Sequence, residues 1–131
     1  MEGRLLLVDD DPGVLELLNE YLVAQGYKVE LASNGEAALS AVRATRSDLV
    51  LLDIRMPGLD GVEVLRRLCR QDATLPVVMV TANEDVTLAR ETLSVGAFDY
   101  VARPFDFTHL EQVVVAGMLH GGPSRGGGAP A

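Results

Sequence analysis

The chain has 131 residues, a formal net charge of −8, 48% hydrophobic residues and one cysteine. That length fits one domain with a full apolar core, and the negative charge argues against direct nucleic-acid binding by this domain. A single cysteine excludes an internal disulfide, and no apolar run approaches the roughly 20 residues of a membrane span. We therefore expect a cytoplasmic protein that is not bound to a membrane.

Short apolar runs alternate along the chain with stretches in which apolar residues recur at helical spacing. Such runs at residues 5–8, 48–52 and 77–80 are typical of buried parallel strands, and two further strands are predicted at residues 27–32 and 98–102. The stretches between and after them predict helices over about residues 12–26, 34–43, 60–71, 84–95 and 106–119. This alternation specifies an α/β fold with a parallel sheet and helices on both faces.

Local signals mark the ends of several predicted elements. The residues expected to cap the first three helices are Asp11, either Ser33 or Asn34, and Asp60. Residues 121–131, GGPSRGGGAPA, cannot build a core, so we expect a flexible tail or the stub of a linker there. The domain is therefore placed at residues 1–120.

Polar side chains stand at the carboxyl ends of four predicted strands. The first, third, fourth and fifth strands end, respectively, at Asp9 with Asp10, at Asp53, at Thr81 and at Arg103. Open α/β sheets bind ligands in the crevice outside these strand ends. Groups that are far apart in the sequence are therefore expected to lie together at one edge of the sheet.

The residue types at this edge favour phosphoryl chemistry. Clustered carboxylates raise one another's pKa, and they stay ionised more readily with a cation among them. Oxygen ligands of this kind favour Mg²⁺, which can also hold a phosphoryl oxygen. The Thr81 hydroxyl, the backbone amide beside Ala82 and the Arg103 guanidinium are donors that a phosphoryl group requires. A carboxylate is the one group here that could be the nucleophile.

Four motifs make this interpretation specific. The segments VDDD, LLDIRMPGLDG, VMVTA and DYVARPF occur in this order, and together they resemble the receiver domain of bacterial response regulators over about residues 4–119. The resemblance implies a flavodoxin-like (βα)5 doubly wound sheet with strand order 2-1-3-4-5. It also implies a role in two-component, or phosphorelay, signal transduction.

The resemblance implies a role for each acidic residue. Asp53 would be the phosphoacceptor, Asp10 would bind Mg²⁺ directly, and Asp9 would act largely through water. The backbone carbonyl of Arg55 would complete the protein ligands, while its bulky side chain should hinder a water that attacks the phosphoryl group. A receiver domain assists its own phosphorylation and dephosphorylation, so we do not expect an enzyme that acts on a separate substrate.

The resemblance also implies a switch between two states. Thr81 would bond the phosphoryl oxygen, and Tyr100 would be the aromatic residue that turns inward. The face formed by residues 84–119 would then change partners. A sensor histidine kinase or a phosphotransfer protein would donate the phosphoryl group, and an output domain, another partner or a second copy of the chain would bind the switched face.

Arg103 departs from the family pattern, which has lysine before the proline of the fifth strand. Lys28 cannot replace it, because that residue lies at the opposite end of the sheet. The resemblance implies a cis bond before Pro104, which aims Arg103 at the site. Its guanidinium can either form a bidentate pair with Asp53, through two parallel hydrogen bonds, or turn outward. We expect the pairing, because the clustered carboxylates leave excess negative charge.

Two other functions compete with a phosphorylated switch. A receiver-like interaction module that no longer needs phosphate is favoured only by Arg103. A phosphatase of the haloacid dehalogenase-like class would use Asp9 and Asp11, but Gly13 stands where that motif expects threonine or valine. The phosphatase reading also leaves Asp53 without a role.

Overall fold

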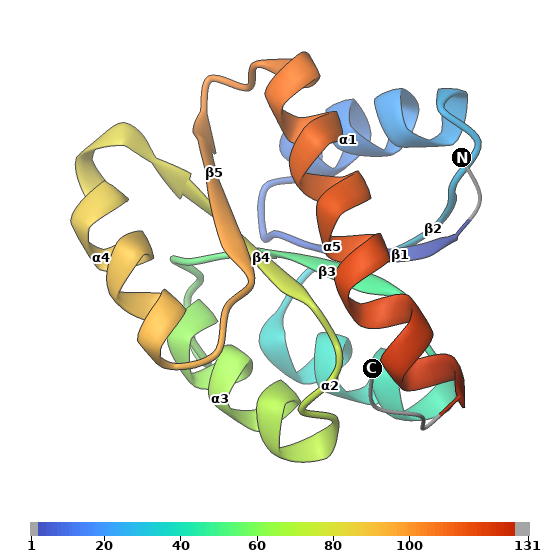
Figure 1. The fold of residues 1–131 in the computed structure, drawn as a ribbon. Helices are drawn as coiled ribbons and strands as arrows, with labels where there is room; N and C mark the ends of the chain where they lie inside the picture. The colour runs from blue at the N-terminus through green and yellow to red at the C-terminus, as the bar shows by residue number, and fades with distance from the viewer. Residues whose placement is uncertain (1–2, 128–131) are drawn as a thin grey trace.

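The computed structural model describes residues 3–127, with side chains described as far as residue 120. Its parallel sheet has the strand order β2-β1-β3-β4-β5, which confirms the predicted flavodoxin-like fold (Figure 1). The strands are β1 (Arg4–Val8), β2 (Lys28–Ala32), β3 (Leu49–Asp53), β4 (Val77–Ala82) and β5 (Asp99–Arg103). The helices are α1 (Pro12–Ala24), α2 (Gly35–Ala44), α3 (Gly61–Gln71), α4 (Val86–Glu91) and α5 (Phe107–Gly127), with the short 3-10 helices η1 (Asn83–Asp85) and η2 (Thr92–Ser94).

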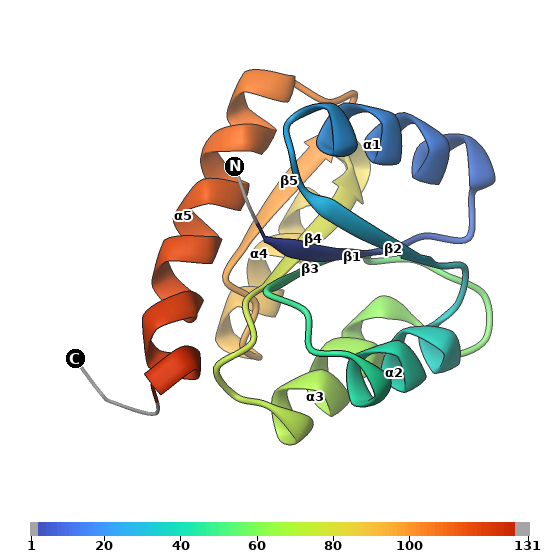
Figure 2. The same cartoon turned by 90° about the vertical axis from the view of Figure 1, so that its right-hand side faces the viewer.

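Helices cover both faces of the sheet. Helices α1 and α5 lie on one face, and α2, α3 and α4 lie on the other (Figure 2). Strand β1 shows why both faces are apolar: Leu5 and Leu7 pack toward α1 and α5, whereas Leu6 and Val8 pack toward α2 and α3. Side chains alternate between the two faces of a strand, so a strand buried on both sides must be apolar throughout.

The predicted caps of the first three helices are confirmed. The Asp11 side chain accepts a hydrogen bond from the Gly13 amide at 2.8 Å, and Asn34 accepts one from the Ala37 amide at 2.8 Å. The Asp60 side chain accepts one from the Glu63 amide at 3.0 Å. Each bond satisfies an amide that has no partner within its own helix.

Gly61 brings the start of α3 against the end of β3. A Cβ atom at this position would lie 2.2 Å from the carbonyl oxygen of Asp53 and 2.7 Å from the Cα of Ile54. Only glycine can be accommodated at that distance. The helix therefore begins directly against the backbone that carries Asp53.

The segment between β4 and β5 differs from the single helix predicted over residues 84–95. Only Val86–Glu91 is α-helical, and the 3-10 helices η1 and η2 flank it. Thr92 is buried, and its hydroxyl donates to the carbonyl of Ala89. The amides of Val95, Gly96 and Ala97 all donate to the Thr92 carbonyl. A side-chain bond and a shared acceptor tighten this turn, which hydrophobic spacing alone does not reveal.

The last helix is longer than predicted. Its backbone continues from Phe107 to Gly127, past the end expected near Leu119. Glycine costs about 1 kcal/mol relative to alanine inside a helix, and residues 121–127 include four glycines. Part of the predicted tail is thus helical in backbone, and residues 128–131 lie outside the described residues. Among the residues described, no helix combines the length and apolar character needed to cross a membrane.

Candidate functional site

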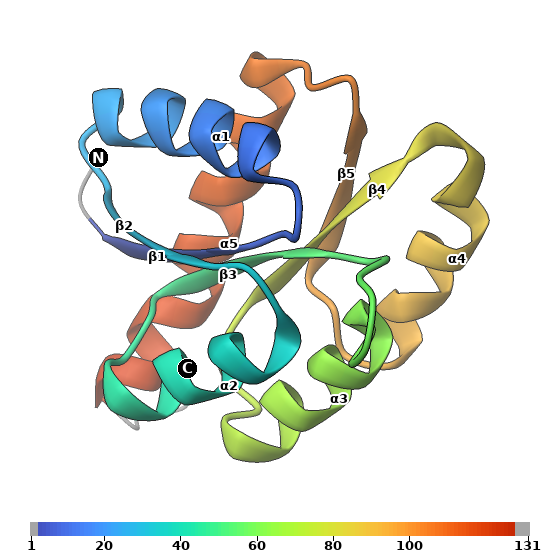
Figure 3. The same cartoon turned by 180° about the vertical axis from the view of Figure 1, so that it is seen from behind.

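Strands β1 and β3 end on the same side of the sheet (Figure 3), and three carboxylates meet there. Asp9, Asp10 and Asp53 each offer an oxygen, and these oxygens lie within 4.8 Å of one another. Asp9 and Asp53 are buried, and Asp10 is exposed. The sheet therefore brings together the acidic residues that were predicted to hold a metal.

Asp9 is held in place by backbone contacts but keeps one free oxygen. Its amide donates to the Ala32 carbonyl at 3.1 Å, and its Oδ1 accepts from the Asp11 amide at 2.9 Å. Its Oδ2 is buried and has no hydrogen-bond partner among the described residues. Burial raises the pKa of Asp9 above its ordinary value. A buried carboxylate oxygen without a partner is costly, and a cation at this position would stabilise it.

Asp53 is the last residue of β3, and its exposed fraction is 2%. Its Oδ1 accepts a hydrogen bond from the Arg55 amide at 3.3 Å. Burial first, and the charge of Asp9 second, raise the pKa of Asp53 from 3.8 to about 7. The Arg55 amide and the Arg103 charge act in the opposite direction. Without a cation, this carboxyl group therefore titrates near neutral pH.

The Arg103 guanidinium turns toward the carboxylates. One terminal nitrogen lies 3.9 Å from Asp53 Oδ1, and the side chain is 31% exposed. The expected pairing of Arg103 with Asp53 is confirmed. The predicted bidentate geometry is wrong, because the one contact between the two side chains is longer than a hydrogen bond. Arg103 Nε is buried and has no hydrogen-bond partner within the described part of the chain. The predicted cis bond between Arg103 and Pro104 is confirmed.

The hydroxyl of Thr81 lies at the carboxyl end of β4. Thr81 is fully buried, and its hydroxyl donates to the carbonyl of the next residue, Ala82, at 3.0 Å. Tyr100 is half-buried and packs against the core on the α2, α3 and α4 face. The phosphoryl contacts of Thr81 and Ala82 and the switch role of Tyr100 stay predictions. Lys28 begins β2, opposite Arg4, so its expected distance from the site is confirmed.

An ion pair beside the site was not predicted from the sequence. Arg55 Nε lies 2.7 Å from Asp85 Oδ2, and a terminal nitrogen donates to Asp85 Oδ1 at 2.9 Å. The hydrogen bond from Arg55 holds the pKa of Asp85 below its ordinary value. The two residues are 30 positions apart, and neither hydrophobic periodicity nor a motif links them. Opposite charge was the only available signal.

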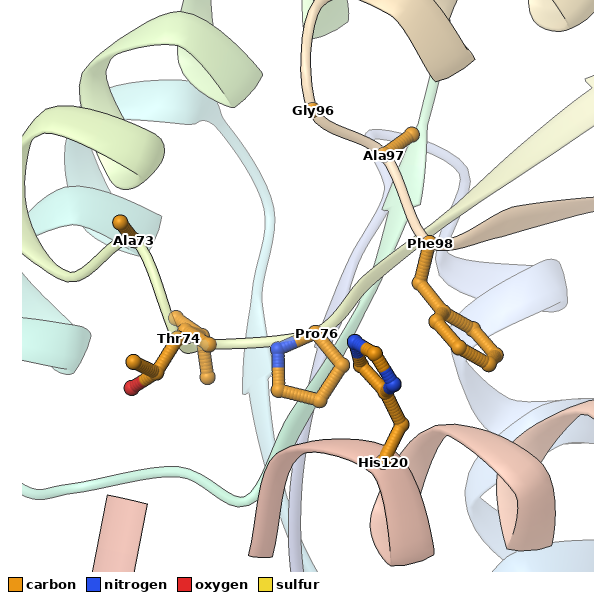
Figure 4. A pocket seen from close by; sticks show the side chains of 8 residues that line it. Ala73, Thr74, Pro76, Gly96, Ala97, Phe98 and His120 are labelled. Carbon is orange, nitrogen blue, oxygen red and sulfur yellow. The ribbon is translucent and has the colours of Figure 1, made fainter. Parts of the chain in front are cut away.

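A cavity of about 370 Å³ lies at the other end of the sheet (Figure 4). Its lining includes Pro76 and Phe98, which precede β4 and β5, and His120 of α5. The rings of Phe98 and His120 are 5.1 Å apart. None of the three clustered carboxylates lines this cavity. His120 is therefore separate from the acidic site.

Comparison with known sequences agrees with this arrangement. The model of the response regulator receiver domain matches residues 5–115. The chain is 39% identical over 114 residues to sporulation initiation phosphotransferase F of Bacillus subtilis, covering 87% of this chain and 92% of that protein. It is 45% identical over 105 residues to the DNA-binding response regulator MtrA of Mycolicibacterium smegmatis. That match covers 80% of this chain but 46% of MtrA, so the chain spans less than half of that relative.

Comparison with solved structures gives the same result. The receiver domain of NtrX from Brucella abortus superposes with a TM-score of 0.85 at 30% identity, covering 88% of this chain and 98% of that one. The family match extends over most of the sequence, and the sheet order and the position of the clustered acids are those expected of the family. The chain belongs to the response regulator receiver domain family.

Proposed function

We propose that Asp53 accepts a phosphoryl group in a Mg²⁺-dependent reaction. The observation that carries this proposal is the convergence of three carboxylates, with oxygens within 4.8 Å of one another, on the buried end of β3. Asp9 Oδ2 adds a buried oxygen without a hydrogen-bond partner among the described residues. An all-oxygen donor set of this kind fits Mg²⁺.

Each residue of the site has its own role in binding Mg²⁺. Asp10 and Asp53 would bind Mg²⁺ directly, Asp9 would act on it largely through water, and the Arg55 carbonyl would complete the protein ligands. The bound ion would neutralise charge on the phosphoryl oxygens. A Mg²⁺ ion also favours the ionised form of Asp53, whose pKa burial raises to about 7.

Phosphoryl transfer exchanges one bond for another. A carboxylate oxygen of Asp53 forms the new O–P bond while the P–N bond to the histidine of the donor breaks. The Thr81 hydroxyl must leave the Ala82 carbonyl, to which it now donates at 3.0 Å, in order to reach a phosphoryl oxygen. Arg103 already lies 3.9 Å from Asp53 and needs only a small approach. The chain therefore assists chemistry at its own side chain and does not turn over a separate substrate.

The partners follow from this role. The donor would be a sensor histidine kinase or a phosphotransfer protein in the cytoplasm. The face from residues 84–119, which contains α4, β5 and the start of α5, would change its contacts with an output domain, another partner or a second copy of the chain. Coupling would run from Thr81 to Tyr100, which is half-buried against the core and would turn inward.

Incorporation of phosphate from acetyl phosphate tests the proposal. The wild-type chain should take up about one phosphoryl group per molecule with Mg²⁺ and none with excess chelator. Asp53→Asn should abolish uptake, because the nucleophilic oxygen is lost. Asp60→Asn is a matched control, since this carboxylate caps α3 and lies outside the acidic cluster. Uptake that survives Asp53→Asn defeats the proposal, and a wild-type chain that takes up nothing favours a phosphate-independent interaction module.

A further inference from the structure

A single ion pair ties together two segments that carry the proposed phosphoryl ligands. Arg55 follows Asp53 by two residues, and its amide donates to the Asp53 carboxylate at 3.3 Å. Asp85 ends η1, directly beyond Thr81 and Ala82 of β4. Strands β3 and β4 are neighbours, so the Arg55–Asp85 pair connects the segments that leave adjacent strand ends.

The register of the sheet places this connection beside the phosphoacceptor. Asp53 is paired with Val80 across the two strands, and the Ile54 amide donates to the Val80 carbonyl at 3.0 Å. The strands run together to the level of Asp53, and the segments beyond it separate toward α3 and η1. The side chains of Arg55 and Asp85 reach across that separation.

The geometry of the pair restricts the position of the guanidinium. Two nitrogens of Arg55 bond to the two oxygens of Asp85, at 2.7 and 2.9 Å. A two-point contact fixes the plane of the guanidinium as well as its distance. The Arg55 side chain is 66% exposed, whereas Asp85 is 14% exposed. Asp85 is thus the anchored member, and Arg55 is the member that would move into solvent if the contact were lost.

We propose that Asp85 is a positioning residue that holds the Arg55 guanidinium across the solvent side of Asp53 and thereby slows hydrolysis of its phosphorylated form. This inference rests on the proposed phosphorylation of Asp53. In hydrolysis, a water oxygen bonds to phosphorus, the O–P bond to Asp53 breaks, and the proton of the water leaves with phosphate or solvent. A guanidinium held between the two segments would hinder the approach of this water.

Rates of phosphoryl loss test the role of Asp85. The full chain is labelled with acetyl phosphate and Mg²⁺, the donor is removed, and loss of phosphate is followed in the wild type and in the variants Asp85→Ala, Arg55→Ala and the double variant. Each single variant should lose phosphate roughly fivefold faster, and the double variant no faster than either, because the two residues act as one unit. Asp85→Glu should restore part of the wild-type lifetime.

Salt and a neighbouring carboxylate separate positioning from a structural effect. An exposed ion pair is screened by salt. Raising salt from about 0.05 M to about 0.5 M should therefore move the wild-type rate toward that of Asp85→Ala and change the latter little. Glu84→Ala is the matched control, because Glu84 is an exposed acid on the same 3-10 helix. It should leave the rate within about twofold of the wild type.

Three results would overturn the inference. Asp85→Ala could keep or lengthen the wild-type lifetime, the two single variants could act additively, or Glu84→Ala could match Asp85→Ala. Failure of the underlying function looks different, because then no variant carries label at Asp53 at all. That outcome removes both proposals, whereas normal labelling with equal lifetimes removes the role of Asp85 alone.

Discussion

The two ends of the same sheet differ in the charged side chains that they bury: the carboxyl end buries Asp9 and Asp53, whereas Arg4, Lys28 and Asp48 at the amino end are partly or fully exposed. At the amino end, the Arg4 amide donates to the Asp48 side chain at 2.8 Å, and Lys28 is exposed to solvent. At the carboxyl end, Asp9 Oδ2 and Arg103 Nε are buried without hydrogen-bond partners among the described residues. Between the two ends, the central strands β1, β3 and β4 are buried and apolar. The end that buries two carboxylates is the one that is suited to bind a cation and a phosphoryl group.

Removing the exposed carboxylate at the carboxyl end should have the largest effect. Asp10→Asn should weaken Mg²⁺ binding at least about tenfold, since even changes outside the direct ligands cost about 10–100-fold. Asp48→Asn, which removes a carboxylate at the amino end, should leave Mg²⁺ affinity unchanged. Titration calorimetry on both variants checks the contrast. Equal affinities in the two variants would mean that the acidic cluster is not the metal site.

The dependence of stability on pH should also distinguish the two ends. Because the folded-state pKa of Asp53 is raised from 3.8 to about 7, the folded chain binds more protons than the unfolded chain between these values. In the absence of Mg²⁺, this residue therefore lowers the free energy of unfolding as the pH rises through that window. Thermal unfolding of the wild type and Asp53→Asn across this range measures the effect.

The quantity to compare is the difference in the free energy of unfolding between the wild type and Asp53→Asn at each pH. Asp85 has the opposite sign because its pKa is lowered, and it contributes equally to both proteins. Asp53→Asn should gain stability relative to the wild type as the pH rises, and Mg²⁺ should reduce that gain by binding the folded wild type. A difference that is independent of pH would contradict the buried environment assigned to Asp53.

Arg103 should affect coupling more than uptake of phosphate. Its nitrogen lies 3.9 Å from Asp53, and a hydrogen bond to a charged group is worth about 1.5–3 kcal/mol once formed. Arg103→Ala should therefore reduce the structural change that follows phosphorylation, measured by amide NMR shifts of residues 84–119, and Arg103→Lys should retain it. If Arg103→Ala matched the wild type in both its phosphorylation rate and its amide NMR shifts, Arg103 would have no role in the response to phosphorylation.

A change at the amino end should have the smallest effect on function. His120→Ala removes a ring contact with Phe98 at 5.1 Å, and such pairs contribute about 0.5–1.5 kcal/mol. Unfolding should occur at a slightly lower temperature, while labelling by acetyl phosphate should proceed at the wild-type rate. A labelling rate altered by more than about threefold would show that the two ends of the sheet are coupled. Such a change means that the activation free energies of labelling in the wild type and the variant differ by about 0.7 kcal/mol.

The ends of β3 and β4 could be predicted from the sequence because burial makes these strands apolar up to Asp53 and Thr81. Arg103 was placed at the same edge as the residue that follows the fifth predicted strand, and the structure puts it at the end of β5. The strand order came from resemblance to a family, and periodicity alone does not supply it. Helix caps were predictable because the capping bond joins residues two or three positions apart.

The features that were missed depend on contacts between distant residues. The Arg55–Asp85 pair joins the segment after β3 to η1, and the shape of the α4 region depends on the buried hydroxyl of Thr92. The continuation of α5 to Gly127 runs against local propensity, and nothing in the structure explains it. The bidentate pair expected between Arg103 and Asp53 is replaced by one longer contact. Side-chain conformation and three-dimensional distance decide each of these cases except the length of α5.

The residue that carries the phosphoryl group tests the central claim most directly. The chain can be labelled with acetyl phosphate and Mg²⁺, the acyl phosphate reduced with borohydride, and the modified aspartate located by peptide mass spectrometry. We predict modification of Asp53 alone, the buried residue at the end of β3. Modification of Asp9, or of no aspartate in a chain that still binds Mg²⁺, would contradict the account.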